Sequence, residues 1–306
     1  MVPLTGEQFE IRAGGYRAVV TEGGAALRLL EYAGRPLVDG FAEDEMSFGG
    51  RGQLLMPWPN RIRDGHYEFG GSTHQLALTE PARHNASHGL ARWAAWTLEE
   101  HTGVSVSLVH RLMAQTGYPW TLDLHVVYDL SADGLTVTQT ATNLSGAAAP
   151  YASGAHPYLL AGPGPVDDWE LTLPASTRAL SDERLLPTGS EPVEGTAYDF
   201  RVARPVRGTV LNDTFTDLER DDEDRATVLV RHPAAGTAVA LWADAQHPWL
   251  QVYSADDTPT PRRSLAVEPM TAPVDAFRSG TDVVTLTPAG TAGDELSVTW
   301  GIRAVD

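Results

Sequence analysis

Two residue types are missing from this chain. Its 306 residues contain no cysteine, and arginine alone accounts for all 22 of the combined lysine and arginine residues, so lysine is absent as well. Without a thiol there is no cysteine nucleophile, no disulfide framework and no cysteine-ligated zinc. Without an ε-amine there is no Schiff-base chemistry, no anchor for pyridoxal phosphate and no P-loop of the usual kind.

Basic charge is scarce too. The 22 basic residues stand against 40 acidic ones, which gives a formal net charge of −18. Nucleic acids and anionic membranes need a basic surface, so we expect neither as a partner. The N-terminal residues lack the basic and apolar regions of a secretory signal, and no stretch approaches the ~18 apolar residues of a membrane span. We therefore expect a soluble, cytoplasmic protein.

Apolar and polar residues alternate in short runs through most of the chain, and Gly, Asp and Pro separate the runs. This alternation, with turn signals every ~8–12 residues, is typical of antiparallel β-sheets. No fixed repeat is present, and Pro- and Gly-rich pieces such as 161–165 are too short to separate folding units. We expect one all-β domain over residues 1–306, built as a large antiparallel sandwich or barrel.

Two hairpins are predicted from turn chemistry. Asp64-Gly65, inside the segment 61–71, has the composition of a type I′ turn, and Gly70-Gly71 forms a further turn behind it. The runs 122–128 and 135–141 flank a second hairpin turn. Strands are also expected at 237–242, 250–253, 264–267 and 296–302. The best helical candidate, 217–225, carries a run of charges that is more typical of a solvated loop.

With thiols and amines absent, acid–base chemistry depends on the ten histidines, the carboxylates and tyrosine. Ahead of Arg61 and Arg63, two prolines and Trp58 fix an irregular segment. It is either a rigid loop with surface arginines or a guanidinium held ready for two ligand oxygens. His88 and His156 lie beside Gly or Pro in small-residue segments, where loops present side chains to a site, although a lone histidine is more often structural.

Glu268 ends an apolar strand and is followed at once by Pro269. Partial burial would raise its pKa toward the range of a general base, and the alternative is a structural carboxylate paired with an arginine. His84 and His88 have the spacing of a helical metal-ligand pair. Gly89 and the surrounding residues disfavour a helix, and the His-Glu-x-x-His pattern is absent, so no metal site is predicted.

Taken together, these segments resemble the aldose 1-epimerase (mutarotase) family of the galactose-mutarotase-like superfamily. The resemblance lies in residues 57–67, 85–93, 156–159 and 268–271, which occur in the order of the family. It implies a many-stranded antiparallel β-supersandwich, in agreement with the alternation described above.

The resemblance also implies a role for each matching residue. Glu268 would be the general base and His156 the general acid, while His88 would hydrogen-bond the sugar near its ring oxygen and Arg61 would contact sugar hydroxyls. Where the family usually has an aspartate three residues before an aromatic residue, this chain has Asn212. Asparagine donates and accepts but brings no charge, so this departure affects sugar preference more than catalysis. The neighbouring Asp213 could substitute if the loop shifts.

Exchanging the anomers of an aldose requires a base at the C1 hydroxyl and an acid at the ring oxygen, and no cofactor or metal. The sequence therefore predicts an aldose 1-epimerase with a small sugar as substrate. A slight upward shift of the pKa of His156 from ~6.5 would suit the acid, and a raised pKa of Glu268 above ~4.3 would suit the base. Trp58 and Trp93 could stack on the sugar, although core packing is the commoner role.

Two other functions stay open. One is a hexose-6-phosphate mutarotase, which Arg61 and Arg63 motivate, and the other is a non-catalytic sugar-binding protein of the same fold. A glycoside hydrolase needs two carboxylates ~5–9 Å apart, and only Glu268 can be nominated. A net charge of −18 repels phosphorylated sugars at long range and does not act on neutral ones, so a neutral sugar is the better expectation.

Overall fold

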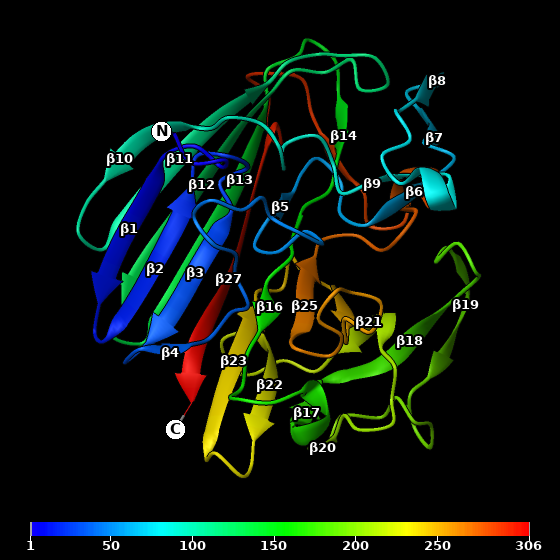
Figure 1. The fold of residues 1–306 in the computed structure, drawn as a ribbon. Helices are drawn as coiled ribbons and strands as arrows, with labels where there is room; N and C mark the ends of the chain where they lie inside the picture. The colour runs from blue at the N-terminus through cyan, green and yellow to red at the C-terminus, as the bar shows by residue number, and fades with distance from the viewer. Residues whose placement is uncertain (1, 306) are drawn as a thin grey trace.

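The computed structural model describes residues 2–305, and strands make up nearly all of the regular structure (Figure 1). The largest sheet has nine antiparallel strands, in the order β10 (Thr97–His101), β11 (Ser105–Leu112), β12 (Leu122–Ser131), β13 (Gly134–Asn143), β27 (Glu295–Val305), β23 (Thr237–Ala243), β22 (Ala226–His232), β17 (Glu170–Thr172) and β20 (Arg204–Pro205). The all-β antiparallel prediction is confirmed.

A second sheet carries eight strands. Its order is β19 (Pro187–Pro192), β18 (Ala175–Ser181), β21 (Asn212–Leu218), β24 (Trp249–Tyr253), β25 (Leu265–Met270), β15 (Gly154–Ala155) and β5 (Leu54–Leu55), and β16 (Tyr158–Leu159) also pairs with β25. A third sheet has four strands, β1 (Gln8–Ala13), β2 (Tyr16–Thr21), β3 (Leu27–Tyr32) and β4 (Arg35–Pro36).

The remaining elements are short. Three two-stranded ladders pair β14 (Ala149–Tyr151) with β26 (Val284–Leu286), β6 (Arg61–Arg63) with β9 (Asn85–Ser87), and β7 (His66–Phe69) with β8 (Ser72–Gln75). The helical pieces are η1 (Pro81–Arg83), η2 (Val166–Asp168) and α1 (Ala276–Ser279). Among residues 2–305, no helix has the length and apolar character needed to cross a membrane.

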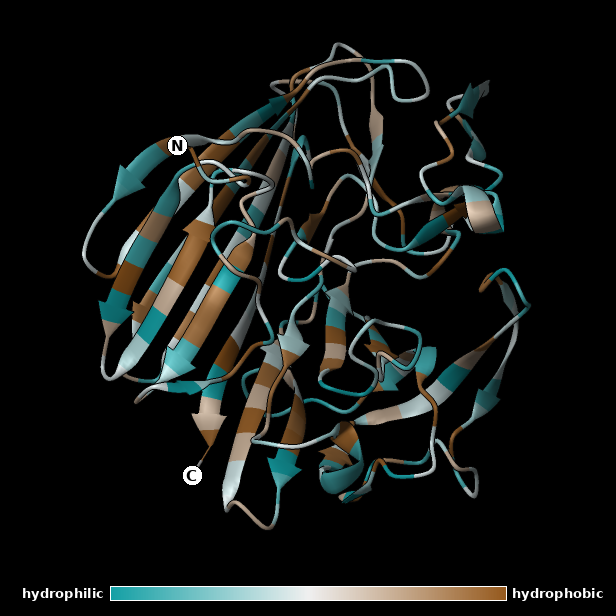
Figure 2. Cartoon of the chain, in the orientation of Figure 1, coloured by the Kyte–Doolittle hydropathy of each residue, from teal (hydrophilic) through white to brown (hydrophobic). Residues whose placement is uncertain are grey.

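Strand alternation builds the core. Along β12 every second residue is buried, and Figure 2 shows the matching alternation of hydrophobic and hydrophilic bands on the strands of the large sheets. β1 and β2 of the four-stranded sheet pack against β11 and β12, and the Tyr128 hydroxyl donates to the carbonyl of Ala25 at 2.6 Å across this interface. The apolar faces of facing sheets therefore bury one another.

The hairpin predictions have mixed outcomes. β12 and β13 form the predicted hairpin, with Ser131 opposite Gly134. Gly70-Gly71, both at positive φ, joins β7 to β8 as expected. Asp64-Gly65 does turn the chain, but β6 pairs with β9 and β7 with β8, so the hairpin predicted there is wrong.

Competing backbone partners explain the failed hairpin. The amide of Arg63 donates to the Asp275 carboxylate at 2.8 Å, and the amide of Asp64 donates to the carbonyl of His84 at 3.1 Å. The strands expected at 237–242, 250–253, 264–267 and 296–302 are present as β23, β24, β25 and β27. Of residues 217–225, Asp217 and Leu218 end β21, and residues 219–225 form the loop that their charge indicates.

Candidate active site

Five of the six residues predicted from the sequence line one cavity of about 340 Å³. They come from distant parts of the chain: Arg61 from β6, His88 directly after β9, His156 between β15 and β16, Asn212 from the start of β21, and Glu268 from β25. The sixth, Asp213, does not line this cavity.

The register of three strands aligns part of the cavity wall. Glu268 lies opposite Gln251 on β24, and Gln251 lies opposite Thr214 on β21. Residues opposite one another in antiparallel strands point to the same face, so Glu268 and Gln251 share a face with Thr214 and with Asn212, two positions before it. Gln251 lines the cavity and was not predicted, because its place depends on pairing between strands that are distant in sequence.

The same alternation excludes Asp213. As the immediate neighbour of Asn212 on a strand, it points to the opposite face of the sheet. There its Oδ1 lies 3.1 Å from Nε of Arg178. Asp213 therefore does not share the cavity with the acid–base pair, and instead lines a smaller cavity beside it, together with Arg61, Asn212 and Gln251.

The backbone and two neighbours fix the ring of His156. Its amide donates to the carbonyl of Gln53 at 3.0 Å, and its imidazole stacks on Tyr158 with ring centroids 5.0 Å apart and an interplanar angle of 8°. Gly50 lies close to the imidazole, and a Cβ atom there would approach Cδ2 of His156 to 2.8 Å. This position requires glycine both for space and for its φ of +80°.

His156 and Glu268 contact each other inside the protein. Nε2 of His156 lies 3.3 Å from Oε1 of Glu268, and the two residues are only 5% and 2% exposed. Oε2 of Glu268 is buried and has no hydrogen-bond partner among the described residues. The pair therefore leaves an unsatisfied carboxyl oxygen on a residue that lines the cavity.

Burial reverses the usual order of the two pKa values, so that the pKa of Glu268 lies above that of His156. It raises the pKa of Glu268 to about 8, against the opposing field of Arg61, and it lowers the pKa of His156 to about 3. The upward shift expected for His156 is therefore wrong, because removing the imidazole from water disfavours its charged form. Burial therefore favours the uncharged form of both groups, a protonated Glu268 beside a neutral imidazole.

His88 is a second neutral imidazole in the cavity. Its amide donates to the carbonyl of Asn60 at 2.8 Å, and its ring meets that of His156 edge-on with centroids 5.4 Å apart. Burial holds the pKa of His88 well below its ordinary value. His84 lies elsewhere, with Nδ1 at 3.0 Å from the Asp64 carboxylate. Within residues 2–305, no three His, Asp or Glu side chains form a group that could hold a metal ion.

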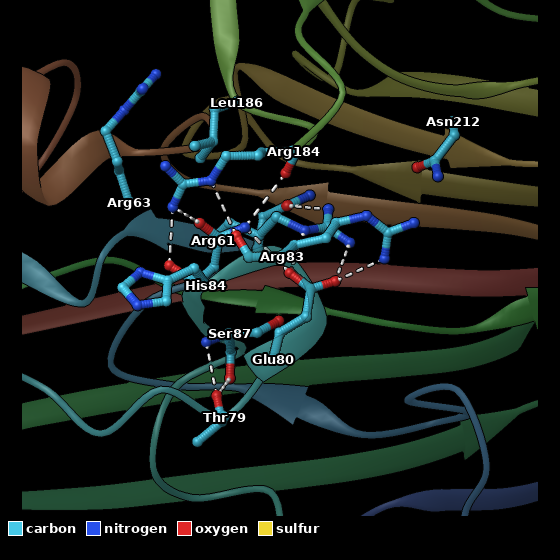
Figure 3. A network of polar contacts seen from close by, with 12 residues as sticks. Arg61, Arg63, Thr79, Glu80, Arg83, His84, Ser87, Arg184, Leu186 and Asn212 are labelled. Carbon is cyan, nitrogen blue, oxygen red and sulfur yellow. Dashed lines mark hydrogen bonds and ion pairs between the residues drawn. The ribbon is translucent and has the colours of Figure 1, made fainter.

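Arg61 is held by a carboxylate that the sequence did not point to. Its Nε and Nη2 donate to the two oxygens of Glu80 at 2.8 and 3.0 Å (Figure 3). Arg63 lies within 4 Å of the carboxylates of Asp275 and Asp182, at 3.7 and 3.8 Å, and does not line the cavity. Arg61 and Arg63 therefore do not form the joint phosphate site that motivated a hexose-6-phosphate mutarotase. The one sequence signal for Glu80 is its place just ahead of the matching segment 85–93.

The two tryptophans behave differently. Trp58 is 2% exposed and packs on the ring of Phe277, with centroids 5.8 Å apart, so it belongs to the core. Trp93 lines the cavity and is 51% exposed. The guanidinium of Arg92 lies 5.5 Å from its ring centroid, and no carboxylate among the described residues is within ion-pair distance of Arg92. Burial lowers the pKa of Arg92 from its ordinary value.

Comparison with known proteins defines the class of fold. The structure superposes on the GalM/aldose epimerase homologue from C. elegans with a TM-score of 0.87 over 98% of both chains, at 20% identity. It superposes on a putative aldose 1-epimerase from Escherichia coli K12 with a TM-score of 0.82 over 98% of this chain and 99% of the other, also at 20% identity. The predicted galactose-mutarotase-like β-supersandwich is confirmed.

Sequence comparison then gives the family. Residues 7–299 match the family model of aldose 1-epimerase, and the chain belongs to that family. It is 36% identical over 283 residues to the uncharacterized protein YihR of Escherichia coli, covering 92% of this chain and 89% of the other. It is 29% identical over 278 residues to the galactose mutarotase of Homo sapiens, covering 82% and 78%.

Proposed function

We propose that the protein is an aldose 1-epimerase, an isomerase that interconverts the α and β anomers of an aldose. The observation that carries this proposal is the His156–Glu268 pair, with Nε2 and Oε1 3.3 Å apart and one carboxyl oxygen unsatisfied in the cavity. Acid and base side by side match a reaction that removes a proton from the C1 hydroxyl and delivers one to the ring oxygen, since both oxygens are bound to C1. Membership of the aldose 1-epimerase family supports the same assignment.

The reaction begins with a proton shift inside the pair. Transfer from Glu268 to His156 gives a carboxylate beside an imidazolium without changing the net charge of the site. Glu268 then takes the proton of the C1 hydroxyl, the bond between C1 and the ring oxygen breaks as C1=O forms, and His156 gives its proton to the ring oxygen. Rotation about C1–C2 and the reverse transfers close the ring on the other face.

The surrounding residues have binding roles in this proposal. His88 is neutral and can hydrogen-bond the sugar near its ring oxygen, and Arg61 offers its remaining N–H groups to hydroxyls. The hydroxyl of Thr214 donates to Oε1 of Gln251 at 2.6 Å, and Nε2 of Gln251 donates to Oδ1 of Asn212 at 3.0 Å. This relay leaves the Asn212 amide group as a donor toward the cavity, where an aspartate would only accept.

Polarimetry tests the proposal. Freshly dissolved α anomers of several aldoses are followed with and without the protein, and calorimetry measures binding of the same sugars. We expect anomerisation of at least one aldose to accelerate in proportion to protein concentration. Binding of a sugar with no acceleration for any aldose would contradict the proposal and favour a non-catalytic sugar-binding protein.

A phosphorylated aldose is the second candidate substrate, and Arg92 is the observation that favours it. This half-buried cation lines the cavity and has no carboxylate partner among the residues that the structure describes. If it receives a phosphate, kcat/KM for a hexose 6-phosphate exceeds that for the free hexose, and Arg92→Gln abolishes the difference. Equal loss for both substrates, or a preference for the free hexose, would exclude this candidate.

A further inference from the structure

Glu80 joins two arginines beside the cavity (Figure 3). Its carboxylate accepts four hydrogen bonds: from Nε and Nη2 of Arg61 at 2.8 and 3.0 Å, from Nη1 of Arg83 at 3.0 Å and from Nδ2 of Asn85 at 3.1 Å. The Glu80 side chain is 18% exposed and that of Arg61 is 13% exposed, so water screens their contact only weakly. Four hydrogen bonds and low exposure distinguish this carboxylate from one in an ordinary surface ion pair.

The carboxylate of Glu80, together with Asn60, fixes the orientation of the Arg61 guanidinium. Glu80 takes two of its five N–H donors in a bidentate contact, and Asn60 Oδ1 takes a third at 3.0 Å from Nη1. Two N–H groups remain for a ligand. A guanidinium fixed through three donors loses little further freedom when a sugar binds.

The carboxylate also offsets part of the positive charge of the two arginines that it contacts. Arg61, Glu80 and Arg83 together carry a net charge of one, whereas the two arginines alone would carry two. Arg61 is the charged group whose field acts on Glu268 and lowers its pKa against the effect of burial. Removing the charge of Glu80 would strengthen that field, and removing the charge of Arg83 would weaken the positive total.

We infer that Glu80 is a positioning residue of the active site, which orients Arg61 for the sugar and offsets its charge so that the Glu268–His156 pair retains its proton. This inference rests on the proposed epimerase function for the meaning of the pair, but the titration of Glu268 can be measured without any substrate. The titratable and charged groups around the pair, besides Glu80 and Arg83, are Arg61 from β6, His88 after β9, Tyr158 on β16, Tyr253 on β24, Asp257 after β24, and Arg51 and Arg92 through their fields on His156.

The experiment uses glutamate labelled with ¹³C at its carboxyl carbon, with the Glu268 signal assigned by its loss in Glu268→Gln. We expect the titration midpoint of Glu268 to fall by roughly half a pH unit in Glu80→Gln and to rise by a similar amount in Arg83→Gln. Asp123→Asn is the matched control, because Asp123 pairs with Arg111 on an exposed surface. Its midpoint should equal that of the wild type.

A third variant separates the effect of the Glu80 charge from the effect of its side-chain length. Glu80→Asp keeps the charge but is too short for the same bidentate contact, so we expect kcat/KM to fall about tenfold or more while the midpoint stays within ~0.2 pH unit of the wild type. Unchanged midpoints in both Glu80→Gln and Arg83→Gln, or shifts in the same direction, would overturn the inference. If Glu80→Gln does not fold, the direction of the shift in Arg83→Gln decides, because the Arg83 side chain is 35% exposed. A wild type without epimerase activity would refute the proposed function and leave this titration test intact.

Discussion

Burial acts on Glu268 and His156 in opposite directions, and the pH dependence of the reaction should show it. With a pKa of about 8 for Glu268 and about 3 for His156, the pair holds one proton through the neutral range. We predict that kcat/KM for anomer exchange stays level through neutral pH and falls only above pH ~8, where the last proton leaves. A histidine with an ordinary pKa would give a fall above pH ~6.5, and that midpoint in a pH–rate profile would contradict the prediction.

The carboxyl group of Glu268 should lower the free energy of unfolding at alkaline pH. A carboxyl whose pKa is higher in the folded protein than in the unfolded chain makes folding less favourable as pH rises from ~4.3 toward about 8. We predict that Glu268→Gln raises the free energy of unfolding on the order of 1–3 kcal/mol at pH 8 and has little effect at pH 4. Urea unfolding at the two pH values measures this. Lower stability of the variant at pH 8 would contradict it.

At the scale of elements, one arginine fastens the segment that carries Glu80. Arg184, on the connection between β18 and β19, donates to the carbonyls of Arg83 and His84 at 2.9 Å each and to Oδ1 of Asp64 at 2.8 Å. Removing it takes one donor from each carbonyl, which leaves that of His84 with only the amide of Asp64 among the described residues, at 3.1 Å, and loosens the turn that precedes β9.

We predict that Arg184→Ala raises KM several-fold with a smaller change in kcat, and that amide hydrogens of residues 83–88 exchange about tenfold faster. Arg201→Ala is the matched control, because among residues 2–305 the side chain of Arg201 pairs only with Asp199, its neighbour on the same loop. Equal exchange rates in the two variants would show that Arg184 does not hold this segment.

The positions of most strands could be predicted from the sequence, but the pairing between strands could not. Alternation identified β12, β13 and the four late strands, because side chains of a strand must alternate whatever its neighbours are. It could not identify partners, so β6 was assigned to the wrong hairpin. For the same reason Gln251 and Glu80 were missed: their places depend on contacts between segments distant in sequence. Asp213 is a different case, because alternation along β21 places it next to Arg178 and outside the cavity that Asn212 lines.

At the scale of the whole molecule, the site exists only when segments from residue 61 to residue 268 meet. The absence of lysine and cysteine leaves histidine and carboxylates for acid–base chemistry, with arginine to bind, and the cavity contains those groups. The net charge of −18 does not hinder the capture of a neutral sugar but repels an anionic one at long range. A phosphorylated substrate would therefore depend on a local cation such as Arg92.

The proposed anomer exchange requires Glu268 and His156 to act as one unit. Polarimetry with the best aldose compares the wild type with Glu268→Gln, His156→Asn and the double variant, and Asp123→Asn serves as the control for folding and handling. We predict that each single variant loses roughly 10²–10⁴-fold in kcat and that the double variant loses little more, because each residue fails without the other. Rates equal to the wild type in either single variant would contradict the account.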